Sequence, residues 1–374
     1  MARLALPVII LRRNRALQLK QRRNERRMMR YMDKAFSMSD DELRANYRVD
    51  KDFIEEIINE LKPYMQCPKR RSDISPKYKI LVALYFYATG SYQRLVGGTY
   101  GTLMSQQSAS RAIREVTDAL NNHNILGKWI RFPQTRQERD AIKRRFYEKF
   151  NIPAVLGCID GTHISIVRPT ENEERFFNRK HFHSRNVLIV CDADLNILSV
   201  DASFGGASHD SFIWNQHPVK NHMISLISSG ENVYLLGDSG YAQREYMMTP
   251  ILNADMNSAE EYYNKLHCSA RNTVERTIGR LKNRWRCLLG HRVLHYHPNR
   301  AGKITIACCV LHNMCNKRYD FMHEELEDNA IQTDDSGNIS IPEERLNVTS
   351  AAELRRGIEK RTALVQHLFA ARIM

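Results

Sequence analysis

Apolar runs in the middle of the chain are interrupted or ended by aspartates, and this pattern constrains the fold most. The run VLGCIDGTHISI (residues 155–166) has the composition of a strand with Asp160 at its centre, and VYLLGDSGY (233–241) repeats the pattern with Asp238. Aspartate is depleted from strands, and a buried carboxylate without a partner is costly. If the two runs are neighbouring parallel strands, their aspartates meet where open α/β sheets bind ligands. The alternative is that each aspartate only caps a turn.

The surrounding segments predict a mixed α/β layout. Strands are expected at 154–160 and 163–167, and the run NVLIVCDADLNILSVDASF (186–204) predicts a hairpin, because a polar DADLN turn separates two apolar stretches. A helical segment at 208–228 precedes the second aspartate-bearing strand. A long helix with an apolar stripe and a buried helix (ITIACCVLHNMC, 304–315) follow. This order of strands, a helix, a strand and further helices indicates a mixed sheet with flanking helices.

The part of the chain before this sheet is predicted to be all-helical. A short helix and a glycine-rich turn (GGTYGT, 97–102) precede a longer helix with one apolar and one polar face. The polar face includes Gln107, Arg111 and Arg114, and such side chains contact base edges and phosphates in DNA. This order is typical of a helix-turn-helix, although an ordinary amphipathic helix with a wet face gives the same pattern.

Composition divides the chain into five parts. Residues 1–30 carry ten Lys or Arg and one Glu. They are expected to form a basic, disordered tail, suited to nuclear import or to phosphate binding, or simply a solvated terminus. The other parts are a helical, helix-turn-helix-like DNA-binding domain at 31–135, an α/β domain at 136–318, an acidic linker at 319–348 and a C-terminal helix at 349–374.

The charge pattern favours a nucleic-acid partner. The net charge is +14, and a second basic cluster, RNTVERTIGRLKNRWR (271–286), has six Arg or Lys and one acid. Two separate basic clusters fit nucleic acid better than a small anionic metabolite. No apolar run approaches the ~20 residues of a membrane helix, so no membrane partner is expected. The eight cysteines are scattered without a CxxC pair, which is typical of reduced thiols in an intracellular protein.

The acids suggest a metal site. Asp160 and Asp238, if adjacent, repel and raise each other's pKa unless a cation neutralises them, and oxygen ligands favour Mg²⁺ or Mn²⁺. Glu275 is the only acid in the second basic cluster and is expected as a third ligand. The alternative is an i,i+4 ion pair with Arg271, which stabilises a helix by only ~0.2–0.5 kcal/mol. Asp210 is a fourth candidate, although the first turn of a helix stabilises an acid anyway.

Histidines and cysteines offer weaker candidates. Four of them have a zinc-like spacing but lie in the buried helix, where core thiols and a hydrogen-bonded histidine are expected instead: Cys308, Cys309, His312 and Cys315. Four further histidines are too scattered for a nucleophile triad: His163, His183, His209 and His267. Of these, only His163 is close enough in sequence to Asp160 to orient a water molecule there.

Six segments, in this order, carry a resemblance to a known family: GCIDGTHISI, NRKHFHSRNVLIVCD, SHDSFIWN, LLGDSGY, VERTIGRLKNRWR and CCVLHN. From about residue 40 to residue 317 the chain closely resembles the Harbinger transposase-derived nucleases, which are DDE-type proteins with an RNase H-like core. The resemblance implies catalytic carboxylates at Asp160, Asp238 and Glu275, with Asp210 as a further metal ligand.

The resemblance also implies a reaction, namely hydrolysis of DNA by two Mg²⁺ or Mn²⁺ ions ~3.5–4 Å apart. Asp160 would bridge both ions, Asp238 and Glu275 would each hold one, and Arg271 and Lys282 would hold the DNA backbone. Relatives often depend on a separate Myb-like DNA-binding partner protein. A nuclear protein, also present in the cytoplasm and able to form a homo-oligomer, fits this picture. Two alternatives are a catalytically silent DNA-binding adaptor and an active transposase.

Overall fold

The structure is a computed structural model that describes residues 5–31, 38–70, 73–98, 104–319 and 348–372. The chain forms two compact units. The helical unit comprises residues 1–122 together with the short segment Trp285–Cys287, and the α/β unit comprises the remainder. The helix bounds in the helical unit are α1 Ala5–Tyr31, α2 Asp40–Tyr47, α3 Lys51–Leu61, α4 Pro76–Thr89, α5 Gln93–Gly98 and α6 Gln106–Leu120.

Local sequence signals set the ends of these helices. Ser39 caps α2 in a reciprocal capping box with Glu42, and α4 begins at Pro76 and ends at Gly90 in the left-handed conformation. A Cβ atom at Gly90 would lie 3.0 Å from the backbone of Cys287. The segment after α11 is thus packed into the helical unit, where the fully buried Trp285 ring lies 6.4 Å from that of Tyr87.

The predicted disorder of the N-terminal tail is wrong, because residues 5–31 form the helix α1. Its sequence is rich in Arg and Leu, which favour helix, and it contains no glycine. Its only proline, Pro7, lies in the first turn, where proline is tolerated. The residues from 10 to 25 are all exposed, so the basic character of the segment is fully presented to solvent.

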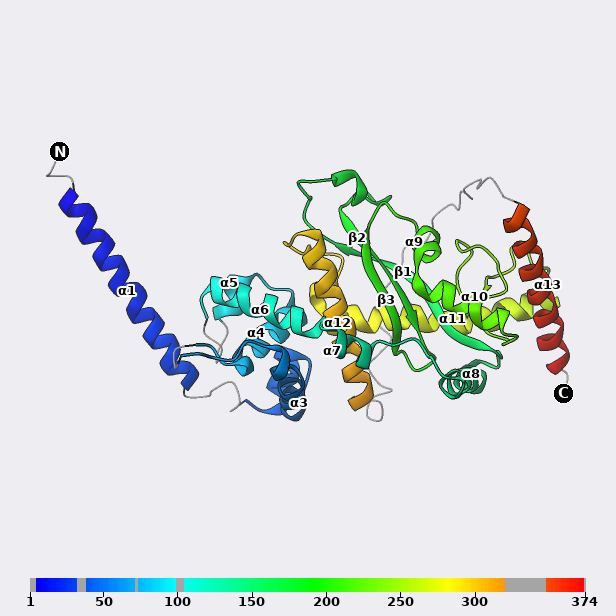
Figure 1. The fold of residues 1–374 in the computed structure, drawn as a ribbon, viewed down its shortest axis with the longest axis horizontal. Helices are drawn as coiled ribbons and strands as arrows, with labels where there is room; N and C mark the ends of the chain where they lie inside the picture. Colours follow the sequence, from blue (N-terminus) through cyan, green and yellow to red (C-terminus); the bar gives the residue numbers. More distant parts are fainter. Residues whose placement is uncertain (1–4, 32–37, 71–72, 99–103, 320–347, 373–374) are drawn as a thin grey trace. The chain divides into compact units, whose positions relative to one another are not determined.

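The α/β unit is built on a five-stranded sheet of order β3-β2-β1-β4-β5, which is consistent with an RNase H-like fold (Figure 1). β1 pairs antiparallel with β2 and parallel with β4, while β2 pairs with β3 and β4 with β5. The strand bounds are β1 Val155–Ser165, β2 Ser184–Cys191, β3 Ile197–Gly205, β4 Tyr234–Leu236 and β5 Met247–Met248. The helix bounds are α7 His123–Trp129, α8 Arg136–Phe150, α9 Asp210–Gln216, α10 Pro218–Ser228, α11 Ala259–Arg284, α12 Pro298–Tyr319 and α13 Val348–Ala371.

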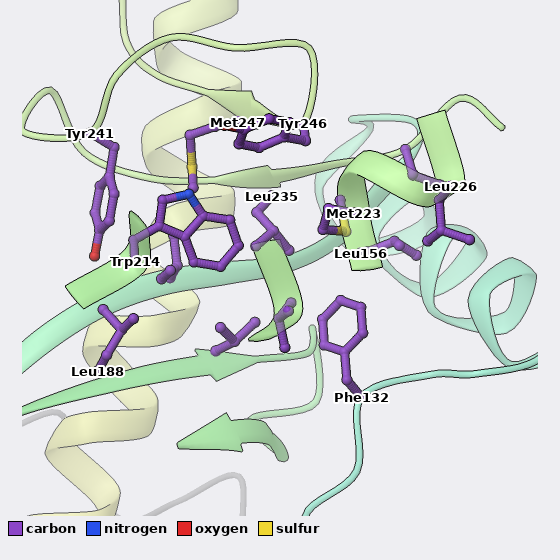
Figure 2. Packing of buried hydrophobic residues seen from close by; sticks show 14 of the residues in the cluster. Phe132, Leu156, Leu188, Trp214, Met223, Leu226, Leu235, Tyr241, Tyr246 and Met247 are labelled. Atoms are coloured by element: carbon purple, nitrogen blue, oxygen red, sulfur yellow. The ribbon is translucent and has the colours of Figure 1, made fainter. Parts of the chain in front are cut away.

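Helices cover both faces of the sheet. On one face, side chains of β1, β2 and β4 pack with Trp214 of α9 and Met223 of α10 in a buried cluster (Figure 2). On the other face, the Cys158 thiol of β1 donates to the carbonyl of Ala270 in α11 over 3.2 Å, and Arg185 of β2 donates to the start of α12. Successive side chains of a strand point to opposite faces of the sheet, so neighbouring residues of β1 contact helices on different sides of it.

The strand predictions are largely confirmed. The hairpin of residues 186–204 is β2–β3, and its turn is held by the Asp192 carboxylate, which accepts the backbone N–H groups of Asp194 and Asn196. The two strands expected at 154–160 and 163–167 are the single strand β1, because β1 pairs continuously with β2 across that region. The short strand β5 was not predicted, since two residues carry no periodic signal.

The domain limits differ from the predicted ones at the first boundary. The helical unit ends at residue 122 instead of 135, because α7 packs on α12: Asn313 donates to the Trp129 carbonyl over 2.7 Å. The C-terminal helix is α13, which packs on α11 and β5. The predicted acidic linker falls outside the described residues, apart from its ends. Among the described helices, none combines the length and apolar character that crossing a membrane would need.

Candidate active site

Asp160 and Asp238 lie at the same edge of the sheet. In the parallel pair β1–β4, Cys158 is opposite Leu236, and each aspartate follows two residues later. The prediction that the two runs are parallel neighbours is therefore confirmed. Asp160 nevertheless lies inside a strand and not at its end, because β1 continues as the partner of β2 after β4 has ended. Beyond β4, the Asp238 carboxylate accepts the backbone N–H of Gly240 over 2.9 Å.

The Asp160 carboxylate is largely buried beside other charges. Its side chain is 17% exposed, and it accepts the N–H of Gly161 over 2.9 Å and the Arg271 guanidinium over 3.4 Å. Burial raises its pKa to about 7, Arg271 opposes this rise, and the nearby carboxylates of Asp210 and Asp238 add to it. Three aspartates are thus close enough to influence one another, and Arg271 compensates for their charge only in part.

Asp210 approaches β1 from the other face of the sheet. A Cβ atom at Gly161 would overlap the Asp210 carboxylate, so only glycine allows this close approach. The carboxylate accepts the Asn186 amide over 2.6 Å. Burial raises the pKa of Asp210, and Asp238 raises it further. Asp210 lies in the first turn of α9, as predicted, but its carboxylate is directed at strand β1 and is held by strand β2.

Glu275 and Arg271 form an ion pair along α11. The Arg271 guanidinium donates to Glu275 over 2.6 Å, one helical turn away, and also contacts Asp160. The predicted alternative for Glu275, an i,i+4 pair, is therefore present. Arg271 faces the acids and stands between Asp160 and Glu275, whose side chain is 40% exposed. In this arrangement the helix supplies a cation to the aspartates, and Glu275 is held by that cation.

The comparisons with known proteins place this geometry in a family. A family model described as DDE superfamily endonuclease matches residues 159–313. The bovine and human proteins named "Putative nuclease HARBI1" are each 34% identical to the chain over 279 residues, which is 74% of this chain and 78% of theirs. The chain belongs to the DDE superfamily endonucleases. No solved structure matches it.

The matched region of this DDE endonuclease contains all four acids of the site and ends within α12. A more distant relative from Arabidopsis thaliana, named "Protein ALP1-like", is 26% identical over 257 residues, covering 63% of this chain and 59% of its own length. The N-terminal helices α1–α6 and the C-terminal helix α13 lie outside the family match.

Two buried polar groups of the DDE endonuclease were not found from the sequence. The Tyr241 hydroxyl and the Asn186 side-chain oxygen are buried, and neither has a hydrogen-bond partner in the described part of the chain. Tyr241, whose side chain is drawn in Figure 2, is 4% exposed. Its ring packs on Gly237, just before Asp238. Burial raises the pKa of the Tyr241 hydroxyl most, and the charges of Asp210, Asp160 and Asp238 raise it further. In the sequence, the signal that could have pointed to Tyr241 is its place at the end of the GDSGY turn.

The residues present fit a hard divalent cation. Carboxylate oxygens are the ligands that Mg²⁺ and Mn²⁺ prefer, and the pKa of Asp160 is raised first by burial and then by the neighbouring Asp210 and Asp238 carboxylates. The unpartnered Tyr241 hydroxyl lies among the same acids. Across the described residues, however, no group of three or more His, Cys, Asp or Glu side chains is already gathered in a metal-holding arrangement.

The remaining candidates of the α/β unit have structural partners. Lys282 is half-buried and donates to the carbonyl of His163 over 3.2 Å, and burial lowers its pKa to about 8. The Nδ1 atom of His163 is hydrogen-bonded to the Ser184 hydroxyl. Burial lowers the pKa of His163 to about 4, so its ring is neutral near pH 7. His312 is bonded to the Leu195 carbonyl at 2.9 Å inside the core, as expected for a structural histidine. His267 is bonded to a backbone carbonyl as well.

The predicted DNA-reading residues lie on α6 in the helical unit. The apolar face of α6 is buried, including Ala112 and Ile113, while Gln107, Arg111 and Arg114 are exposed. The predicted division into two faces is confirmed. The glycine-rich turn that precedes α6 lies mostly outside the described residues, and contact of these side chains with DNA stays a prediction.

Proposed function

We propose that this chain is a divalent-metal-dependent DNA endonuclease that derives from a Harbinger-type transposase. The observation that carries the proposal is the register of β1 and β4, which brings two aspartates to one sheet edge beside a third. Membership of the DDE superfamily endonucleases supports the same reaction class. The proposed substrate is the phosphodiester backbone of DNA.

Each residue of the site has a proposed role. When bound, Mg²⁺ or Mn²⁺ would supply an activated water and neutralise charge on the leaving oxygen. Asp160 and Asp238 would hold the cations, with Glu275 joining after it separates from Arg271 and Asp210 acting as a further ligand. Asp160 has a pKa of about 7, so it must lose its proton before it can bind a cation, and binding releases that proton. Released from the acids, Arg271 would be free to contact a DNA phosphate.

A nicking assay on supercoiled plasmid with Mg²⁺ tests this proposal. Asp160→Asn should reduce nicking to background while DNA binding is kept. Asp201→Asn is the matched control, because Asp201 lies on β3 and its carboxylate caps Ser203. Equal nicking by wild type and Asp160→Asn would overturn the assignment, and so would an equal loss in both variants.

The Arg271 bridge favours a second candidate function, a DNA-binding adaptor without turnover. In such a protein, Arg271 would serve permanently as the counterion of Asp160 and Glu275. Calorimetry with Mn²⁺ separates the two functions. An endonuclease should bind Mn²⁺ and lose that binding in Asp160→Asn, whereas an adaptor should show no Asp160-dependent binding.

The proposed setting is the nucleus, with some protein in the cytoplasm, and DNA as the partner. A Myb-like DNA-binding protein is a further proposed partner, and self-association into a homo-oligomer is compatible with the function. The exposed basic residues of α1 support nuclear import or phosphate contact. Copurification from nuclei, followed by identification of the bound proteins, tests these partners directly.

A further inference from the structure

An exposed basic turn lies between β1 and β2. We define the basic turn as residues 175–183, with the sequence RFFNRKHFH. It carries three cations and no acid, and Arg175, Arg179 and Lys180 are all exposed. Phe177 is also 44% exposed, although an apolar ring normally avoids water. Three acids precede the turn, Glu171, Glu173 and Glu174, and of these Glu173 pairs with Arg168 and with His183.

A buried asparagine fixes the shape of the basic turn. Asn178 is 3% exposed, and its side-chain oxygen accepts the backbone N–H of Lys180 over 2.9 Å. Its amide donates to the Ser184 hydroxyl over 2.8 Å, and its backbone bonds to Phe182 and His181. His181 adopts a φ of 61°, in the left-handed region that few side chains favour. A merely solvated loop needs no such internal framework, so the backbone at the tip of the turn is held in a defined shape.

The basic turn is attached to the segment that leads into the acidic site. The N–H of Ala207 donates to the Arg175 carbonyl over 3.2 Å, and the N–H of Gly206 donates to the Ser184 carbonyl over 2.8 Å. A Cβ atom at Gly206 would overlap the Ser184 hydroxyl, so the two segments are in direct contact. Three residues after Ala207 the chain reaches Asp210.

Two histidine rings pack near Phe177. Its ring lies 5.3 Å from that of His183 and 5.9 Å from that of His181. These contacts orient the ring without covering it, since almost half of the side chain stays exposed. Proteins that bind single nucleic-acid strands combine such rings, which stack on bases, with cations that contact the backbone.

We propose that the basic turn binds the nucleic-acid strand that enters the site, with Arg179 and Lys180 on its phosphates and Phe177 stacked on an unpaired base. This inference rests on the proposed endonuclease function for its substrate. It adds a specific requirement, namely an unstacked base beside the scissile phosphate. The turn would therefore favour DNA that is single-stranded or locally opened over a continuous duplex.

Fluorescence anisotropy with labelled DNA in EDTA tests the inference without any cleavage. The paired replacement Arg179→Gln with Lys180→Gln should reduce the salt dependence of binding, because loss of two phosphate contacts lowers the log–log slope by roughly 2. Phe177→Ala should weaken binding of single-stranded DNA by roughly 5- to 100-fold and duplex binding much less. Phe177→Tyr should retain the affinity. Arg136→Gln, an exposed cation at the start of α8, is the matched control and should change little.

The outcomes separate this inference from the proposed function. Unchanged affinity and salt slope in the turn variants, with wild-type binding and nicking intact, would overturn the inference and leave the endonuclease standing. Turn-dependent binding without metal-dependent nicking would support the inference and remove the endonuclease. Equal weakening of single-stranded and duplex DNA by Phe177→Ala would eliminate base stacking. Thermal unfolding of each variant, matched to wild type, ensures that the turn has kept its framework.

Discussion

The buried Asp160 carboxylate should lower the free energy of unfolding of the metal-free protein at neutral pH. Asp160→Asn should restore the free energy that is lost in this way. The ordinary pKa of 3.8 rises to about 7 in the folded chain, first through burial and then through neighbouring carboxylates. Between these two values the folded state keeps a proton that the unfolded chain has released. The free energy of unfolding therefore falls as pH rises from about 4, and the loss is complete above about 7.

The size of this penalty follows from the two pKa values. Each tenfold change in proton affinity corresponds to 1.36 kcal/mol, so the difference between 3.8 and about 7 amounts to roughly 4 kcal/mol at most. Asparagine has nearly the same shape, can still accept the N–H of Gly161 and carries no charge. The variant should therefore equal wild type near pH 4 and exceed it by roughly 2–4 kcal/mol at pH 8.

Urea unfolding in EDTA, followed by circular dichroism at both pH values, measures the effect. Asp201→Asn serves as the control for the loss of a carboxylate outside the site. Added Mg²⁺ should then stabilise wild type at pH 8 but not Asp160→Asn. If the variant is no more stable than wild type at pH 8, Arg271 already compensates fully for the carboxylate, and the reasoning from burial is refuted.

Four further substitutions test the site and the elements that support it. Gly161→Ala should displace the Asp210 carboxylate, abolish nicking and lower the free energy of unfolding by about 1–3 kcal/mol. Gly279→Ala, where a Cβ atom meets only open space, should instead raise the free energy of unfolding by up to about 1 kcal/mol. The nicking assay and urea unfolding measure both effects. Arg271→Gln should tighten Mn²⁺ binding in calorimetry, because it removes the competing cation, and weaker binding would contradict this. Leu368→Ala on α13 should lower the free energy of unfolding by about 2–5 kcal/mol, and no change would mean that α13 is dispensable.

The sheet was predictable because its signals are local. Two apolar runs ending in similar Gly-containing turns indicated parallel neighbours, and the DADLN turn indicated the hairpin, and both are present. The position of Asp160 inside β1 was not predictable, since it depends on pairing with β2, a strand more than twenty residues away. β5 is too short to give a periodic pattern, and α1 was missed because charge was given more weight than helix propensity.

The candidate site was predictable in its acids but not in its contacts. Residue type and spacing pointed to Asp160 and Asp238, which share one sheet edge. The orientation of Arg271 toward Asp160 depends on how α11 packs on β1, and nothing local in the helix specifies that packing. The position of Tyr241 was not predictable for the same reason, because the carboxylates near its hydroxyl come from distant segments that only the fold brings together.

The insertion of Trp285 into the helical unit makes the N-terminal third of the protein unsuitable for isolation by simple truncation. A fragment that stops at residue 122 would lack the largest fully buried side chain and would leave a hole of indole size beside Tyr87. A useful dissection would graft residues 285–287 back onto the fragment through a short linker.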